Sequence, residues 1–235
     1  MKTIFFATSL ALFISNITAD EPKDPFAGSP TKTSQPTDDT FKVHNDSDGR
    51  AYFQTGSESY YTRYLAAMKE PSLYDRAPGR PEFEFRFLWL RSFHDPIAVR
   101  IWGTAEGYMI RAIRMTQHKG YTLGAITVDS TRKLSDDESR VLDQLLDVPS
   151  LLTPLNETEV LIGADGVDGA QWIFETCADK KYQMIEFWSL KDYGPTRYAE
   201  LGLDGSKIRD TERLLKFALH LLDLAKIKIP DDEIY

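Results

Sequence analysis

The most constraining feature of the sequence is the stretch 81–115, in which apolar and charged residues alternate with a period of two. In its first part, the residues of one parity are all aromatic: Phe83, Phe85, Phe87 and Trp89. The other parity mixes charge with leucine: Glu84, Arg86, Leu88 and Leu90. A period of two is typical of a β-strand, because successive side chains point to opposite faces of a sheet. We therefore predict a strand here with one strongly apolar face.

Two further β-rich runs, 97–102 and 108–115, flank the short glycine-bounded segment 103–107 and predict a β-hairpin. We expect Trp102 to pair with Tyr108. In that register one face is apolar except for Arg111, which should lie at a sheet edge or pair with a carboxylate, because an unpaired buried charge is very costly. The other face then presents a mixed set of side chains: Arg100, Trp102, Tyr108, Ile110 and Arg114.

Later segments add strands. Residues 121–129 have the composition of another strand, and the runs 171–177 and 182–190 predict a second hairpin in which Cys177 pairs with Tyr182. In this register Glu175 and Glu186 share one face.

Three helices are also expected. The first runs over 57–69 and ends at Pro71, with one apolar side: Tyr61, Tyr64, Leu65 and Met68. Ser135 and Glu138 have the spacing of a capping box, which opens a second helix with an apolar stripe: Val141, Leu142, Leu145 and Leu146. A third amphipathic helix is expected over 207–227, after a loop at 192–206.

Strands joined by short connections favour an antiparallel meander. Together with the helices, they predict an α+β fold: an antiparallel meander sheet with helices packed mainly on one face, forming a single domain over 51–235. Residues 20–50 are rich in Pro, Ser, Thr and Asp and are expected to be a flexible tether. Residues 1–19 have the basic start, apolar run and small final residues of a secretory signal peptide. We therefore expect an exported protein, periplasmic or extracellular, with no membrane anchor after signal cleavage.

The net charge argues against some partners. It is −8 for the whole chain, and removing the signal removes one positive charge, Lys2, to give −9. An acidic protein without a basic block is poorly suited to nucleic acid or anionic membranes. Another protein or a small ligand remains as the expected partner.

Candidate chemistry is sparse. Glu175 and Glu186 would be diagonal neighbours about 7 Å apart, and paired carboxylates can hydrolyse glycosides, although glutamates also occur commonly on solvated strand faces. Counting twelve positions from Asp165 reaches Thr176 rather than the glutamate of a calcium loop. The sequence also has no zinc-ligand spacing and no phosphate-binding glycine loop, so neither a metal nor a cofactor is expected. The single cysteine, Cys177, is either a nucleophile or a small buried apolar residue.

Arginine and aromatic side chains on the first hairpin suggest an interaction surface. Residues of these types are enriched at interface hot spots, which makes a partner-binding surface of four residues: Arg100, Trp102, Tyr108 and Arg114. The alternative is that the arginines decorate an exposed strand and cover the aromatic rings with their stems.

Three segments carry a family resemblance: FLWLRSFHDPIAVR at 87–100, DGAQWIFE at 168–175 and FWS at 187–189. They resemble recurring segments of a group of uncharacterised bacterial exported or envelope proteins, over about residues 52–224. The resemblance implies a bacterial source. That group has no assigned activity, so the resemblance implies no functional residues.

Two hypotheses follow. The first is an exported, non-enzymatic binding protein, such as an immunity-type partner of a secreted effector. The second is an envelope hydrolase that uses Glu175 and Glu186.

Overall fold

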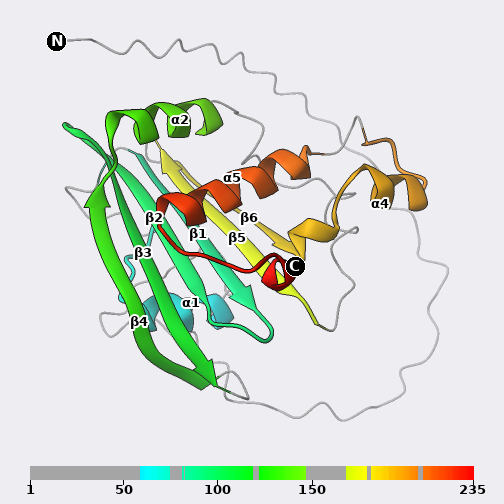
Figure 1. Cartoon of the computed structure of the whole chain (residues 1–235), viewed down its shortest axis with the longest axis horizontal. Helices are drawn as coiled ribbons and strands as arrows, with labels where there is room; N and C mark the ends of the chain where they lie inside the picture. The colour runs from blue at the N-terminus through cyan, green and yellow to red at the C-terminus, as the bar shows by residue number, and fades with distance from the viewer. Residues whose placement is uncertain are drawn as a thin grey trace, which may run out of the picture. The chain divides into compact units, whose positions relative to one another are not determined.

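The computed structural model describes residues 59–74, 81, 83–118, 122–146, 168–178, 181–205 and 209–235. This part of the chain contains a six-stranded antiparallel sheet with helices on both faces (Figure 1). The expected signal peptide, tether and Asp165 segment lie outside the described residues. None of the described helices is long and apolar enough to cross a bilayer.

The first four strands are neighbours in chain order, which confirms the predicted meander. They are β1 (Phe83–Arg91), β2 (Ile97–Thr104), β3 (Gly107–His118) and β4 (Thr122–Lys133). The second hairpin consists of β5 (Ala170–Ala178) and β6 (Lys181–Trp188). It joins the sheet through β5 and β1, giving the order β4-β3-β2-β1-β5-β6 and placing β1 in the interior of the sheet. The predicted α+β class is confirmed.

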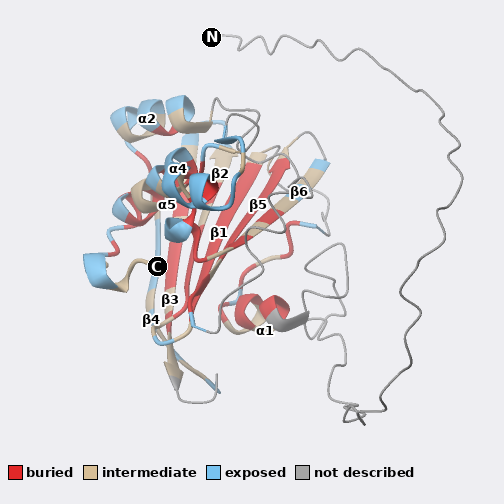
Figure 2. Ribbon diagram, turned by 90° about the vertical axis from the view of Figure 1, so that its right-hand side faces the viewer, coloured by how far each residue is buried: buried red, intermediate tan, exposed pale blue. Residues whose placement is uncertain are grey.

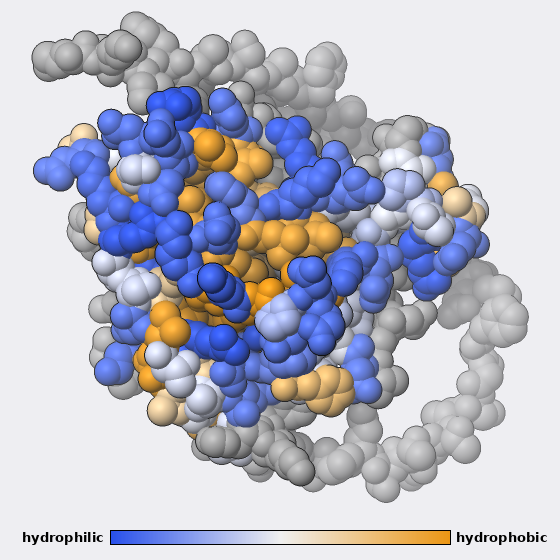
Figure 3. Space-filling model, in the orientation of Figure 1, coloured by the Kyte–Doolittle hydropathy of each residue, from blue (hydrophilic) through white to orange (hydrophobic). Residues whose placement is uncertain are grey.

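One face of the sheet, which we call the α5 face, carries the aromatic residues of β1 and is covered by α2 (Asp136–Leu146) and α5 (Thr211–Leu224) (Figure 1). Phe85 contacts Phe217 of α5 with ring centroids 5.1 Å apart. Aromatic rings also stack along and across β1 and β5, so this face holds the larger core: Phe87, Trp89, Trp172 and Phe174. Seen from this side, apolar surface shows between hydrophilic residues (Figure 3).

The helix boundaries follow from local capping. Ser135 Oγ accepts from the Glu138 amide at 3.2 Å and Glu138 accepts from the Ser135 amide at 2.9 Å, which confirms the capping box of α2. Within the predicted stripe of α2, Leu142 is buried whereas Val141 is exposed. Asp210 caps α5, which therefore begins later than predicted. The expected loop at 192–206 contains the short helix α4 (Pro195–Glu200), preceded by a single helical turn, η2 (Leu190–Asp192).

The opposite face, which we call the α1 face, is covered by α1 (Ser59–Ala67) (Figure 2). The four residues of its predicted apolar side are all buried there: Tyr61, Tyr64, Leu65 and Met68. They pack on apolar residues of the sheet: Leu88, Ala98, Ile113 and Ile173. The helices therefore lie mainly, but not exclusively, on one face.

The last residues of the chain, including the turn η4 (Asp231–Glu233), attach to the ends of β1 and β5. Glu233 pairs with the fully buried Arg91 at 3.0 Å. The main-chain oxygen of Tyr235 accepts from Trp172 Nε1 at 2.8 Å, and its hydroxyl lies 2.9 Å from His94 Nδ1. These contacts extend the α5-face core to the C-terminus.

The register of the first hairpin differs by one residue from the prediction. Trp102 pairs with Met109, and Gly103 pairs with Tyr108. The connection is a turn at 105–106 with Gly107 at φ +119°, a conformation that favours glycine. A shift of one residue sends every side chain of β3 to the other face. Arg111 therefore joins Arg100 on the α1 face, while the α5 face receives three residues that had been expected beside Arg100: Tyr108, Ile110 and Arg114.

Candidate functional site

The predicted four-residue binding surface does not form, because the register separates its members. Arg100 and Trp102 lie on the α1 face. Tyr108 lies against the α5-face core, where its hydroxyl donates to Asp143 at 2.8 Å; burial and this hydrogen bond raise the pKa of Tyr108 to about 12. Arg114 is held by Asp95 of the β1–β2 turn at 3.1 Å.

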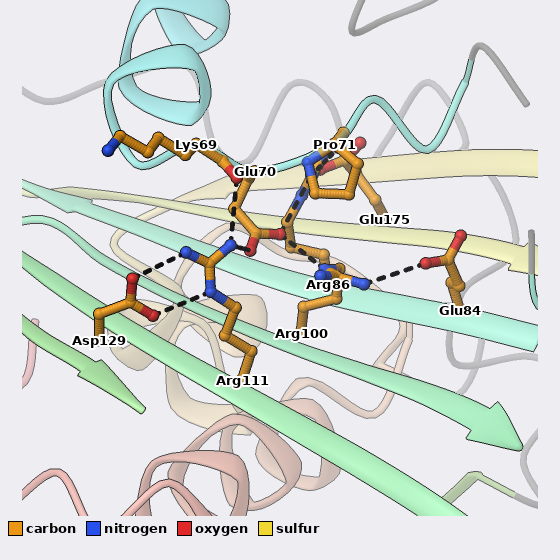
Figure 4. A network of polar contacts seen from close by, with 9 residues as sticks. All are labelled: Lys69, Glu70, Pro71, Glu84, Arg86, Arg100, Arg111, Asp129 and Glu175. Carbon is orange, nitrogen blue, oxygen red and sulfur yellow. Dashed lines mark hydrogen bonds and ion pairs between the residues drawn. The ribbon is translucent and has the colours of Figure 1, made fainter. Parts of the chain in front are cut away.

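Instead, the α1 face contains a row of three arginines on adjacent strands. Arg86 of β1 pairs with Arg100 of β2, which pairs with Arg111 of β3. Like charges directly opposite one another destabilise a sheet. Each guanidinium therefore needs a carboxylate, and four are present around the row: Glu70, Glu84, Asp129 and Glu175 (Figure 4).

Glu70 lies at the centre of this network. Its carboxylate is 2.8 Å from Arg100 Nε, 3.0 Å from Arg111 Nη1 and 3.6 Å from Arg86 Nη1. The end of α1 explains its position: the Glu70 amide donates to Leu65 O and the Lys69 amide to Ala66 O, with Lys69 at φ 54°. This is a Schellman termination, which turns the chain back over the sheet immediately after the helix.

Arg86 and Glu175 form the innermost pair, and neither side chain has exposed surface. Desolvation alone would lower the pKa of Arg86, but Glu175 and Glu70 raise it. Burial raises the pKa of Glu175, against the opposing effects of Arg86 and of the Tyr182 hydroxyl, which donates to it at 3.1 Å. Arg86 also donates to Pro71 O at 2.6 Å, so the pair is covered by the segment after α1.

Glu175 and Glu186 are diagonal neighbours on one face, as predicted, because Cys177 pairs with Tyr182 as expected. Their surroundings do not suit acid–base catalysis. Glu175 is engaged by Arg86 beneath the chain that follows α1, and Glu186 accepts from Tyr61 of α1 at 3.0 Å. A substrate could reach Glu175 only if this covering segment moved.

At its other end the α1 face becomes accessible. We call this region the Trp102 corner: half-buried Trp102 and Met109 with exposed Lys133, which are consecutive cross-strand partners on β2, β3 and β4. The guanidinium of Arg100 lies 4.4 Å from the Trp102 ring centroid. Sequence reasoning identified Trp102 but missed Met109 and Lys133, because the assumed register put Met109 on the opposite face.

Three further features lie outside the arginine row. Cys177 is buried on the α1 face and makes no disulfide. Asp95 accepts from Arg114 and from the Gln117 amide, so it ties the β1–β2 turn to β3. Among the described residues, no group of three or more His, Cys, Asp or Glu side chains is arranged to hold a metal ion.

Comparison of the chain with known protein families, with curated proteins and with solved structures found no match.

Proposed function

We propose that the protein is a non-enzymatic binding protein that acts after export, in the periplasm or outside the cell, and that the Trp102 corner contacts a partner protein. The main support for this proposal is the stacking of the Arg100 guanidinium on the Trp102 ring. Arg100 is itself held by Glu70 and Glu84, so the ring has a rigid support. An aromatic side chain ordered before binding loses little rotamer entropy when a partner packs on it.

The composition of the corner fits a protein partner better than a small ligand. Tryptophan and methionine are enriched in interface cores, and Trp102 and Met109 lie half-buried side by side on adjacent strands of the sheet. Because Arg100 is already neutralised by two carboxylates, its role is to orient Trp102. An immunity-type partner of a secreted effector is one form that such a protein can take.

The hydrolase alternative has weaker support. It requires a carboxyl group that can reach substrate, whereas the Glu175 side chain has no exposed surface and is paired with Arg86. No observation in the described part of the chain favours it over binding.

The test is co-purification from an envelope extract, comparing Trp102→Ala with Phe93→Ala. Phe93 is an exposed aromatic residue, 70% accessible, on the β1–β2 turn and serves as the matched control. We expect Trp102→Ala to lose a partner that the wild type and Phe93→Ala retain, and to weaken binding of the purified partner by more than about tenfold, as for a hot-spot residue. Equal recovery with both variants would remove the Trp102 corner as the contact surface.

A further inference from the structure

The segment 59–74, comprising α1 and the chain that follows it, covers the α1 face and is attached in two different ways. Its helix and the turn that follows contribute an apolar contact, with Tyr64, Leu65 and Met68 fully buried. The chain after the helix contributes an ionic contact, because Glu70 faces the three arginines and Pro71 O accepts from Arg86. Tyr74 then contacts Tyr182 of β6 with ring centroids 5.4 Å apart.

Because of the ionic contact, lifting the segment off the sheet costs less free energy than the loss of its apolar contact alone would. Glu70, Arg86 and Glu175 have at most 1% of their side-chain surface exposed, so each has lost nearly all of its hydration. Lifting the segment would return water to these groups and recover part of the desolvation cost. A nine-residue helix such as α1 is also unstable by itself in water, so its release recovers conformational entropy.

The opposite layer does not depend on this segment. Its core is formed by α2, α5 and the other side of the sheet, and none of the described side chains of α1 belongs to this core. Two separate cores on the two faces allow one to open while the other remains intact, as in sub-global unfolding units of other proteins.

The chemistry beneath the segment defines what could replace it. Without Glu70, the three arginines retain three carboxylates: Glu84, Asp129 and Glu175. Glu70, which the opened surface lacks, is the one carboxylate of the described residues that approaches all three guanidinium groups. Beside it lies the apolar surface that α1 had covered: Leu88, Ala98, Ile113 and Ile173.

We propose that the segment 59–74 is an exchangeable cover: it lifts off the sheet as a unit while the α5 face stays folded, and the uncovered surface accepts an amphipathic helix that ends in a carboxylate. This surface adjoins the Trp102 corner through Arg100, which contacts both Glu70 and the Trp102 ring. The experiments below measure opening of the cover at Cys177, so their outcome does not depend on the function proposed above. The sheet would then have a second binding surface, which the segment 59–74 normally covers.

Cys177 provides a built-in probe of opening. It is the only cysteine of the chain and is 1% exposed. Its cross-strand partners are Glu84 and Tyr182, so it lies on the same face that the covering segment contacts through Arg86 and Tyr182. Because the cover contacts Tyr182, the strand partner of Cys177, through Tyr74, we expect lifting of the cover to expose the thiol to a reagent added to the full chain under native conditions.

The first experiment measures the Cys177 labelling rate against urea for the wild type, Leu65→Ala and Leu221→Ala. Leu65 belongs to the cover, and Leu221 is an equally buried leucine of the α5-face core. We expect labelling below the unfolding transition to rise with urea less steeply than global unfolding does, because only the surface under the cover is exposed. The labelling rate should be at least tenfold higher in Leu65→Ala and stay within twofold in Leu221→Ala. The proposal would be overturned if the wild-type labelling rate depended on urea as steeply as global unfolding does. This comparison uses the wild-type protein alone, so it holds even if a variant fails to fold.

The second experiment adds a synthetic peptide of residues 57–74 to Leu65→Ala, in which the cover opens more often. We expect the peptide to slow Cys177 labelling at least fivefold, and a peptide carrying Glu70→Gln to slow it less than twofold. No slowing by either peptide, or equal slowing by both, would overturn the carboxylate-ended helix as the occupant.

Discussion

Arg86 and Glu175 form an ion pair in the sheet interior, with Arg86 Nη2 2.5 Å from Glu175 Oε2 and no exposed surface on either side chain. The pair connects β1 to β5, strands whose paired residues here are separated by 89 positions in the chain. Each charge is tolerated there only because the other is present. The pair therefore links the meander to the second hairpin.

Removing one charge of this pair should be strongly destabilising. We expect Glu175→Gln to lower the free energy of unfolding by about 3 kcal/mol, because it leaves the buried Arg86 with Glu70 as its remaining carboxylate, 3.6 Å away. Urea denaturation measures this loss. Glu200→Gln, on an exposed helix, is the control and should change stability by less than about 0.5 kcal/mol. A loss for Glu175→Gln as small as the control would mean that the pair does not hold β1 to β5.

The stabilisation that Glu138 provides at the start of α2 should depend on pH. The side-chain hydrogen bond from Arg132 lowers the pKa of Glu138 to about 2, from an ordinary value of 4.5. A lowered folded-state pKa means that the ionised group stabilises the fold above pH 4.5 and that this stabilisation is lost as the pH falls toward 2. We expect Glu138→Gln to reduce stability at pH 6 and to match the wild type more closely at pH 3, as measured by urea denaturation. Asp137→Asn is the control, and an equal pH dependence for both variants would contradict the prediction.

The hairpin register can be tested by disulfide formation. Residues directly opposite on antiparallel strands have Cα atoms about 4.5–5.5 Å apart, within the range of a disulfide. In a Cys177→Ala background, we expect Trp102→Cys with Met109→Cys to form a disulfide on mild oxidation. Trp102→Cys with Tyr108→Cys should remain reduced, because those side chains point to opposite faces. Mass spectrometry after thiol alkylation distinguishes the two pairs, and the reverse result would support the register expected from the sequence.

The C-terminal attachment should contribute to stability through Arg91. Desolvation lowers the pKa of this arginine, and Glu233 opposes the shift. We expect Glu233→Gln to destabilise the protein by about 1–3 kcal/mol, because the buried guanidinium loses its ion-pair partner. The neighbouring exposed residue provides the control, Asp232→Asn, with an expected change below about 0.5 kcal/mol. Thermal unfolding of the two variants would show equal midpoints if the contact were unimportant.

Much of the fold could be predicted from local patterns. The alternation along β1, the capping box of Ser135 and Glu138 and the pairing of Cys177 with Tyr182 all depend on residues close in sequence, and each prediction was confirmed. Arg111 was also expected to require a carboxylate, and it pairs with Asp129 and Glu70.

The sequence alone determined that this chain forms antiparallel strands and amphipathic helices around apolar faces, because side-chain periodicity and capping act over a few residues. Only the tertiary structure decided which charged residues meet. The register of the β2–β3 hairpin differs by one residue from the predicted register, which places Arg111 beside Arg100 and places Tyr108 and Arg114 on the opposite face of the sheet. The contacts of Glu70 with arginines of three strands likewise depend on where α1 docks on the sheet. Docking is set by packing between segments distant in the chain, which no local pattern encodes.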